Sequence, residues 1–349
     1  MLRVTAPVAA AEPEVPEAPS SLTSRLLTPR TIASLAAAAI IVGVAIWRAP
    51  IDWNDAWTRI RHADPLLYLA ALLVYYSSFG VRALRWHVLL KNAGEPEPTR
   101  SLISPIITSF FVNCVVPAKM GDVYRAYLAR VRLHVSASKA LGTIIAERLL
   151  DLCVLMGLLL VAGAIVFHRK APGILVPYVI AGGVVCLAGI AVILTMRAGR
   201  GQRLLRLLPE AVFHRYESFR IGTVTSLRRL PMLVVLTGLV WALESARLGL
   251  VVSALGVSGL GISQFVLIAL VAALLTTIPF LPGGLGLVEA GMVGALIAVG
   301  GVGRQAAISI ALLDRSISYG SLVVLGFIVF AITHVHAPRP ETRPLRAGG

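Results

Sequence analysis

Charged side chains are scarce in this sequence of 349 residues: Asp, Glu, Lys and Arg together make up 14% of it, whereas hydrophobic residues make up 57%. The hydrophobic residues fall in runs that repeatedly approach or exceed the roughly 20 residues with which a helix crosses a bilayer. So little charge and so many apolar runs exclude a soluble globular domain. They predict an all-α fold, a polytopic bundle of membrane helices.

Cysteine is scarce too, and the common signatures of catalysis are missing. Cys114, Cys153 and Cys186 lie in apolar stretches, separated by 39 and 33 residues. These separations fit neither a metal knuckle nor a redox pair, so we interpret the three as small buried hydrophobic residues. There is no glycine-rich nucleotide loop, D-x-D pair, catalytic Cys/His set or metal-ligand cluster. We therefore expect no cofactor and no metal, and movement of any substrate without ATP.

The net charge of +15 comes from basic residues in loops and at the ends of apolar runs. This placement predicts anionic lipid surfaces as partners and argues against nucleic acid. Residues 1–24 are rich in Ala, Pro and Glu, with too few large apolar side chains for a core and no signal-peptide pattern. We expect 1–30 to be a disordered cytoplasmic arm, 31–335 a membrane domain, and 336–349 a disordered basic tail.

The membrane domain is expected to contain about eight helices. The main apolar runs are at 31–47, 65–81, 101–117, 149–167, onward to 196, 231–255, 262–281, 285–302 and 305–332.

The distribution of Lys and Arg predicts the topology. The segment 197–230 holds eight arginines and two glutamates, so it is expected to be cytoplasmic. If the run at 101–117 dips into the membrane and returns, both termini are cytoplasmic as well. Counting back through two spans from 197–230 places 119–148 in the cytoplasm as well, so the link at 168–172 is expected outside despite Arg169 and Lys170. Within 197–230, Leu pairs alternate with Arg at helical spacing, which favours either a helix in the headgroup plane or a solvated basic linker.

Two segments combine proline and glycine after an apolar run: "VPAKMGD" at 116–122 and "LPGGLGL" at 281–287. Proline and glycine interrupt helices, and unpaired backbone at membrane depth is tolerated only inside protein or beside a wet cavity. Such a pair of breaks in two halves is typical of inverted-repeat transporters, although a chance match is the alternative. The residues expected to form the breaks are Pro117, Gly121, Pro282, Gly283, Gly284 and Gly286.

Charged residues flank the first break. Asp122 and Arg125 stand three residues apart, so they are expected to pair, with a phosphate as the alternative partner of Arg125. Glu147, Arg148 and Asp151 lead into an apolar run on one helical surface. Three lipid-exposed charges would cost on the order of 8 kcal/mol, so these side chains are expected to face a cavity, one another or the headgroups.

The second half repeats this combination. Glu289 falls in the first turns of a helix, whose free N–H groups attract anions. Glu244 and Arg247 stand one turn apart inside an apolar run, and Asp314 and Arg315 are placed similarly. Intramembrane pairs of this kind indicate a functional site, with a purely structural tie as the alternative.

Arg82 and Arg85 follow 17 apolar residues and precede Trp86. The two arginines are expected either to snorkel to the interface, with the tryptophan as anchor, or to bind phosphate.

Four ordered motifs, "VRALRWHVLL", "VPAKMGDVYRAYLAR", "AERLLD" and "PGGLGLVEAG", resemble the flippase-like membrane domain of the lysylphosphatidylglycerol synthase family over about residues 30–335. The sequence is also similar to stand-alone relatives associated with hopanoid synthesis and polyprenyl-linked glycosylation. The resemblance implies a helical bundle with re-entrant segments, located in a bacterial plasma membrane. It also implies that the protein moves or handles a lipid with a polar headgroup. Full-length synthases continue into an aminoacyl-transferase domain, so synthesis by this chain alone is not expected.

We select candidate residues for a headgroup site or polar path by two criteria. They either fall on these motifs or are charged residues inside apolar runs. The candidates are Arg82, Arg85, Asn113, Lys119, Asp122, Arg125, Glu147, Arg148, Asp151, Glu244, Arg247 and Glu289.

The sequence favours a flippase or transporter for an anionic phospholipid, hopanoid or polyprenyl-linked lipid. The alternative is a non-transporting scaffold that recruits a lipid-modifying or glycosylating enzyme through the basic segment. A membrane glycosyl- or aminoacyl-transferase is the third interpretation.

Overall fold

The computed structural model describes residues 52–167, 176–199, 209–277 and 282–335, and in these ranges the regular structure is entirely helical. Five helices are long and apolar enough to cross a membrane: Pro65–Asn92, Ala137–Phe167, Val179–Arg197, Leu230–Ala254 and Arg304–Thr333. The prediction of a polytopic helical membrane protein is therefore confirmed. The run at 31–47, the link at 168–172 and both terminal segments lie outside the described residues.

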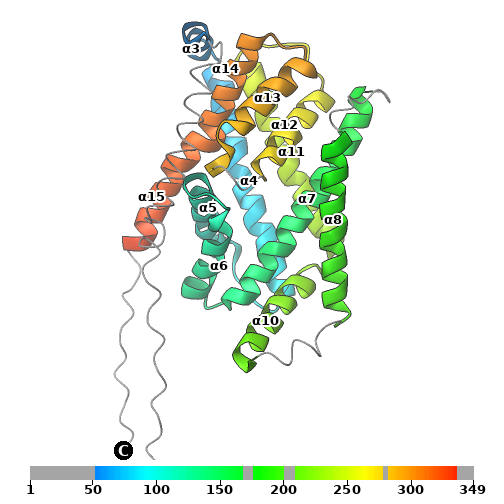
Figure 1. Ribbon diagram of the computed structural model, residues 1–349. Helices are drawn as coiled ribbons and strands as arrows, with labels where there is room; N and C mark the ends of the chain where they lie inside the picture. The colour runs from blue at the N-terminus through cyan, green and yellow to red at the C-terminus, as the bar shows by residue number, and fades with distance from the viewer. Residues whose placement is uncertain (1–51, 168–175, 200–208, 278–281, 336–349) are drawn as a thin grey trace, which may run out of the picture. The chain divides into compact units, whose positions relative to one another are not determined.

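The helices follow one another along the chain as shown in Figure 1. They are α3 (Trp53–Arg61), α4 (Pro65–Asn92), α5 (Thr99–Val115), α6 (Met120–Leu133), α7 (Ala137–Phe167), α8 (Val176–Arg197), α10 (Glu210–Ser226), α11 (Leu230–Ala254), α12 (Ile262–Thr276), the short η2 (Pro282–Gly284), α13 (Leu287–Ala298), α14 (Arg304–Arg315), the π-helical η3 (Ser316–Ser321) and α15 (Leu322–Val335).

Helices α4 and α11 pack along each other, and α7 runs beside both. Helix α4 continues to Asn92, beyond the predicted run at 65–81, and α7 begins at Ala137, well before the predicted 149. In the sequence, charged residues mark the predicted end of the first run and the predicted start of the second. The helices continue through them because those charges are paired inside the protein, where they do not meet lipid.

The first predicted break is the tip of a helical hairpin. Helices α5 and α6 have 17 and 14 residues, about 26 and 21 Å, short of the ~30 Å of a bilayer core. Between them, Ala118 and Lys119 adopt left-handed φ values of 61° and 52°. The Gly121 N–H donates to Asn113 Oδ1 at 2.8 Å, and a Cβ at Gly121 would overlap the backbone of Ser109. The hairpin therefore needs glycine at this position.

The second predicted break also separates two short helices, α12 and α13. Gly283, Gly284 and Gly286 all have positive φ values, 56°, 69° and 80°, which side chains other than glycine rarely adopt. Residues 278–281 of this break lie outside the described ranges. Figure 1 shows the α5–α6 and α12–α13 hairpins entering the bundle from opposite ends.

The tips of the two hairpins meet. The Cα of Cys114, near the end of α5, lies against Gly283, and the Tyr319 hydroxyl of η3 donates to the Cys114 carbonyl at 3.1 Å. The predicted breaks therefore lie close together in the fold although 165 residues separate Pro117 from Pro282.

Helix α10 contains the described part of the predicted headgroup-plane helix. It packs directly on α7: a Cβ at Gly142 would overlap the Phe219 backbone, and one at Gly222 would overlap that of Lys139. Residues 200–208 lie outside the described ranges. The described part is therefore a helix, packed on α7 at two glycines, and its place relative to the headgroups stays a prediction.

Candidate functional site

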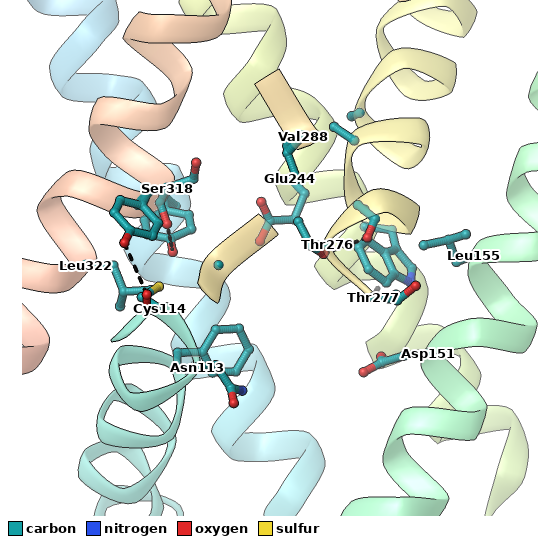
Figure 2. Close-up of a pocket in the computed structure, with 18 of the residues that line it drawn as sticks. Asn113, Cys114, Asp151, Leu155, Glu244, Thr276, Thr277, Val288, Ser318 and Leu322 are labelled. Carbon is teal, nitrogen blue, oxygen red and sulfur yellow. Dashed lines mark hydrogen bonds between the residues drawn. The ribbon is translucent and has the colours of Figure 1, made fainter. Parts of the chain in front are cut away.

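A cavity of about 500 Å³ lies where the two hairpin tips meet. Figure 2 shows the lining residues Asn113 and Cys114 on the left, Asp151 on the right and Glu244 between them. Apolar residues such as Phe110 and Leu155 form much of the wall. Its charged and polar lining residues include Arg82, Asn113, Lys119, Asp122, Arg148, Asp151, Trp241, Glu244, Arg247, Asp314, Arg315 and Ser318.

A cluster of buried charged side chains lies next to the cavity, in the protein core. The Arg85 guanidinium is fully buried and donates to Glu147 at 2.7 Å, to Asp151 at 2.5 Å and to the Thr237 hydroxyl at 2.9 Å. Arg125, also fully buried, lies 3.0 Å from Glu147. Arg85, Arg125 and Glu147 do not line the cavity, so three members of the predicted polar path form part of the protein core.

The cavity-facing part of this cluster joins the first hairpin to α7. Arg148 donates two hydrogen bonds to Asp122, at 3.0 and 3.1 Å, and lies 3.3 Å from Asp151. The predicted pairing of Asp122 with Arg125 is therefore wrong. Arg125 is drawn into the core by Glu147 and by stacking on the Trp86 ring, 3.7 Å from its centroid.

Trp86 and the two arginines before it are not at an interface. Arg82 is 6% exposed and donates to Glu244 at 2.8 Å, while Trp86 is fully buried and donates to the Thr143 hydroxyl at 3.2 Å. The snorkelling interpretation of Arg82 and Arg85 is wrong, because carboxylates from other helices neutralise both inside the bundle.

The second cluster joins α4, α11, α13 and α14. Glu244 accepts from Arg82 and lies 3.2 Å from Arg247, the pair that the sequence places one turn apart. Arg247 also pairs with Asp314. Arg315 donates to Glu289 at 2.7 Å and to the Gly283 carbonyl at 2.8 Å.

Asp314 and Arg315 thus pair with residues of other helices, Arg247 and Glu289, and the sequence alone does not predict these partners. Glu289 is held by Arg315 and is not among the cavity-lining residues.

The ion pairs of the two halves correspond. Asp122 in the first turn of α6 pairs with Arg148, and Glu289 in the first turn of α13 pairs with Arg315. In both pairs the partner stands 26 residues further along the chain. Numbers 122 and 289 differ by 167, as do 148 and 315.

The residues just before these arginines correspond as well. Glu147 binds Arg85 of α4, and Asp314 binds Arg247 of α11. Helices α4 to α7 and α11 to α14 are therefore built on one plan. The acid–arginine dipeptide, repeated at a spacing of 167, is a sequence signal that would have added Asp314 and Arg315 to the candidate set. No comparable signal marks Trp241 or Ser318.

The cavity lining carries five cationic and four anionic side chains. The cations are Arg82, Lys119, Arg148, Arg247 and Arg315, and the anions are Asp122, Asp151, Glu244 and Asp314. Each of these arginines is paired, whereas no carboxylate of the described residues lies within 4.0 Å of the Lys119 amine.

Lys119 caps the N-terminus of α6, and its counterpart at the N-terminus of α13, 167 residues later, is Gly286. Helix N-termini and an unpaired lysine both favour an anion. Among the described residues, Trp241 Nε1 and Ser318 Oγ have no hydrogen-bond partner, which leaves two further polar groups of the lining available to a ligand.

The described ranges hold no group of three or more His, Cys, Asp and Glu that could bind a metal ion, and Cys114, Cys153 and Cys186 are free thiols.

Comparison with known proteins identifies relatives. The family model described as "Lysylphosphatidylglycerol synthase TM region" matches residues 32–326. A UPF0104 membrane protein of Methanocaldococcus jannaschii, MJ1078, is 30% identical over 64% of this chain and 94% of its own length. Glycosyltransferase AglD of Haloferax volcanii is 27% identical over 82% of this chain and 52% of its own length. A UPF0104 membrane protein of Methanothermobacter thermautotrophicus is 28% identical over 83% and 89% of the two chains.

Proposed function

We propose that this chain, which belongs to the lysylphosphatidylglycerol synthase TM region family, moves a lipid with an anionic headgroup across the membrane. The observation that carries the proposal is the cavity at the meeting point of two opposed hairpins, where Lys119 has no carboxylate partner among the described residues while the arginines of the lining are paired. A headgroup would cross through this cavity while its acyl or prenyl chains stay in the surrounding lipid.

The cost of the buried charges supports the proposal. A charged residue inside a membrane helix costs about 2.5 to 3.5 kcal/mol on insertion scales. An apolar core would stabilise the bundle at least as well as these ion pairs do. Charged lining residues offset this free-energy cost when they bind the charged headgroup of a lipid inside the bilayer.

The geometry suggests how the headgroup is handled. Lys119 and the N-terminus of α6 would hold a phosphate at the first tip. Arg148 and Arg315 each tie a hairpin helix to the next helix, through Asp122 and Glu289. A phosphate that competes with Asp122 for Arg148 would loosen the first tie, and one that competes with Glu289 for Arg315 would loosen the second. Alternating release of the two ties would open the cavity to one side at a time.

Flip assays in reconstituted vesicles test this function. Vesicles with a labelled anionic phospholipid report crossing as loss of fluorescence when an impermeant quencher is added. Lys119→Met and Arg148→Gln are each expected to lower the rate at least tenfold, whereas Lys119→Arg keeps it. Arg215→Gln, at an exposed position on α10, is the matched control. Unchanged rates in both Lys119→Met and Arg148→Gln would contradict the proposal.

The scaffold interpretation has one observation in its favour, the similarity to glycosyltransferase AglD, of which this chain spans about half the length. In that case the chain would hold a lipid-modifying enzyme at the membrane through its basic 197–230 segment. The same assay separates the two functions, because a scaffold gives no flipping in vesicles that contain this chain alone.

We further propose that the chain resides in a bacterial plasma membrane with the 197–230 segment and both termini in the cytoplasm. Its support is the excess of arginine in that segment.

A further inference from the structure

A second cavity, of about 720 Å³, lies apart from the first, between α7, α8, α10 and α11. Its wall is almost wholly apolar, with Val154 of α7, Leu194 of α8, Val224 of α10 and Val234 of α11 among the lining residues. Two arginines, Arg197 at the end of α8 and Arg228 just before α11, complete the lining, and no carboxylate contributes to it. We call this space the α8 groove.

Helix α8 has little protein around it. Only 6% of its apolar span is buried, against 28% for α7 and 39% for α11. Figure 1 shows α8 at the edge of the bundle beside α7. Gly182 and Gly189 bring it close to Met156 and Leu149 of α7. The α8 groove therefore runs along a helix that the described protein covers mainly on one side.

The arginines of the α8 groove are exposed and have no acidic partner in the part of the chain that the structure describes. No carboxylate of the described residues lies within 4.0 Å of the Arg197 or Arg228 guanidinium, in contrast to Arg220, which pairs with Glu217 at 2.5 Å. The backbone that carries Arg228 is fixed, since Asn92 donates to its carbonyl at 2.8 Å. Two free cations at the end of an apolar space match the chemistry of an anionic phospholipid, a phosphate attached to acyl chains.

We propose that the α8 groove holds a resident anionic glycerophospholipid, with an acyl chain along α8 and α11 and its phosphate between Arg197 and Arg228. The charge of the two arginines favours this occupant over a zwitterionic lipid or a partner helix. The lipid would complete the packing of α8. This site is separate from the central cavity and does not depend on the transport proposed for it.

Native mass spectrometry of the full chain tests the proposal. Protein stripped of lipid is offered equal amounts of phosphatidylglycerol and phosphatidylcholine with identical acyl chains. We expect one phosphatidylglycerol to be retained with about tenfold preference, a difference of about 1.4 kcal/mol. Arg197→Gln with Arg228→Gln should abolish the preference. Leu194→Trp, which fills the α8 groove, should lower retention of both lipids, and Arg215→Gln should change neither.

Lys119→Met separates this site from the central cavity, because the α8 groove should keep its phosphatidylglycerol in that variant. Loss of the preference in Lys119→Met but not in the double arginine variant would overturn the proposal. Retention of a polypeptide, or equal retention of both lipids by the unaltered protein, would also overturn it.

Discussion

Replacing Arg85 by glutamine is expected to destabilise the protein far more than replacing Arg148, although both arginines contact Asp151. Arg85 is fully buried and also binds Glu147 and Thr237, whereas 29% of the Arg148 side chain is exposed. Removing one partner from a buried ion pair leaves an uncompensated charge and costs about 3 to 5 kcal/mol. At a partly exposed pair the loss is at most about 1 kcal/mol.

Thermal unfolding of the purified variants in mild detergent measures this difference. A change of about 2 to 4 °C per kcal/mol is typical of domains of about 150 to 250 residues, and on that scale Arg85→Gln should lower the midpoint by on the order of 10 °C. Arg148→Gln should lower it by only about 2 to 4 °C, although the flip rate is expected to fall at least tenfold.

A charge-neutral double variant is the control. Arg85→Gln with Asp151→Asn removes one charge of each sign and leaves Glu147 paired with Arg125. It should regain at least half of the lost stability. Two results would show that the buried cluster does not stabilise the fold: Arg85→Gln as stable as the unaltered protein, or the double variant less stable than the single one.

Three further predictions follow from the hairpins and the topology. Gly121→Ala should reduce the yield of folded protein in size-exclusion profiles, because its Cβ would overlap neighbouring backbone; a normal profile would contradict the hairpin geometry. Asp122→Arg should abolish flipping, and the exchange Asp122→Arg with Arg148→Asp should restore part of it, which an unrescued double variant would refute. A cysteine at position 215 should resist an impermeant thiol reagent in intact cells, and its modification would reverse the proposed orientation.

The helix breaks could be predicted because proline and glycine act on their own stretch of chain. Pro117 and Pro282 stand beside glycines that favour a break, and the positive φ values at Gly283 and Gly284 are local as well. Membrane spans follow from composition for the same reason. The fold class was therefore accessible from the sequence alone.

The partners of the charged residues were not accessible in this way. The spacing of Asp122 and Arg125 favours a local pair, but each is bound by a residue of α7, and that choice depends on tertiary packing. The C-terminal end of α4 does not follow from the sequence, because Arg82 looks like a boundary there and its carboxylate partner stands 162 residues away. The α8 groove could not be foreseen either, since four helices have to assemble before its lining exists.

The difference between Lys119 and Gly286 at the two hairpin tips has a thermodynamic consequence. A lipid that crosses passively reaches the same equilibrium between leaflets whatever the protein binds, so the extra lysine cannot drive net transport. It can make the two hairpin tips unequal in affinity for a headgroup. Flux from the leaflet that meets the α5–α6 tip would then saturate at a lower lipid concentration than flux from the other leaflet. Vesicles with the protein in a single orientation would show this as two different half-saturation concentrations, and Lys119→Met would bring them together.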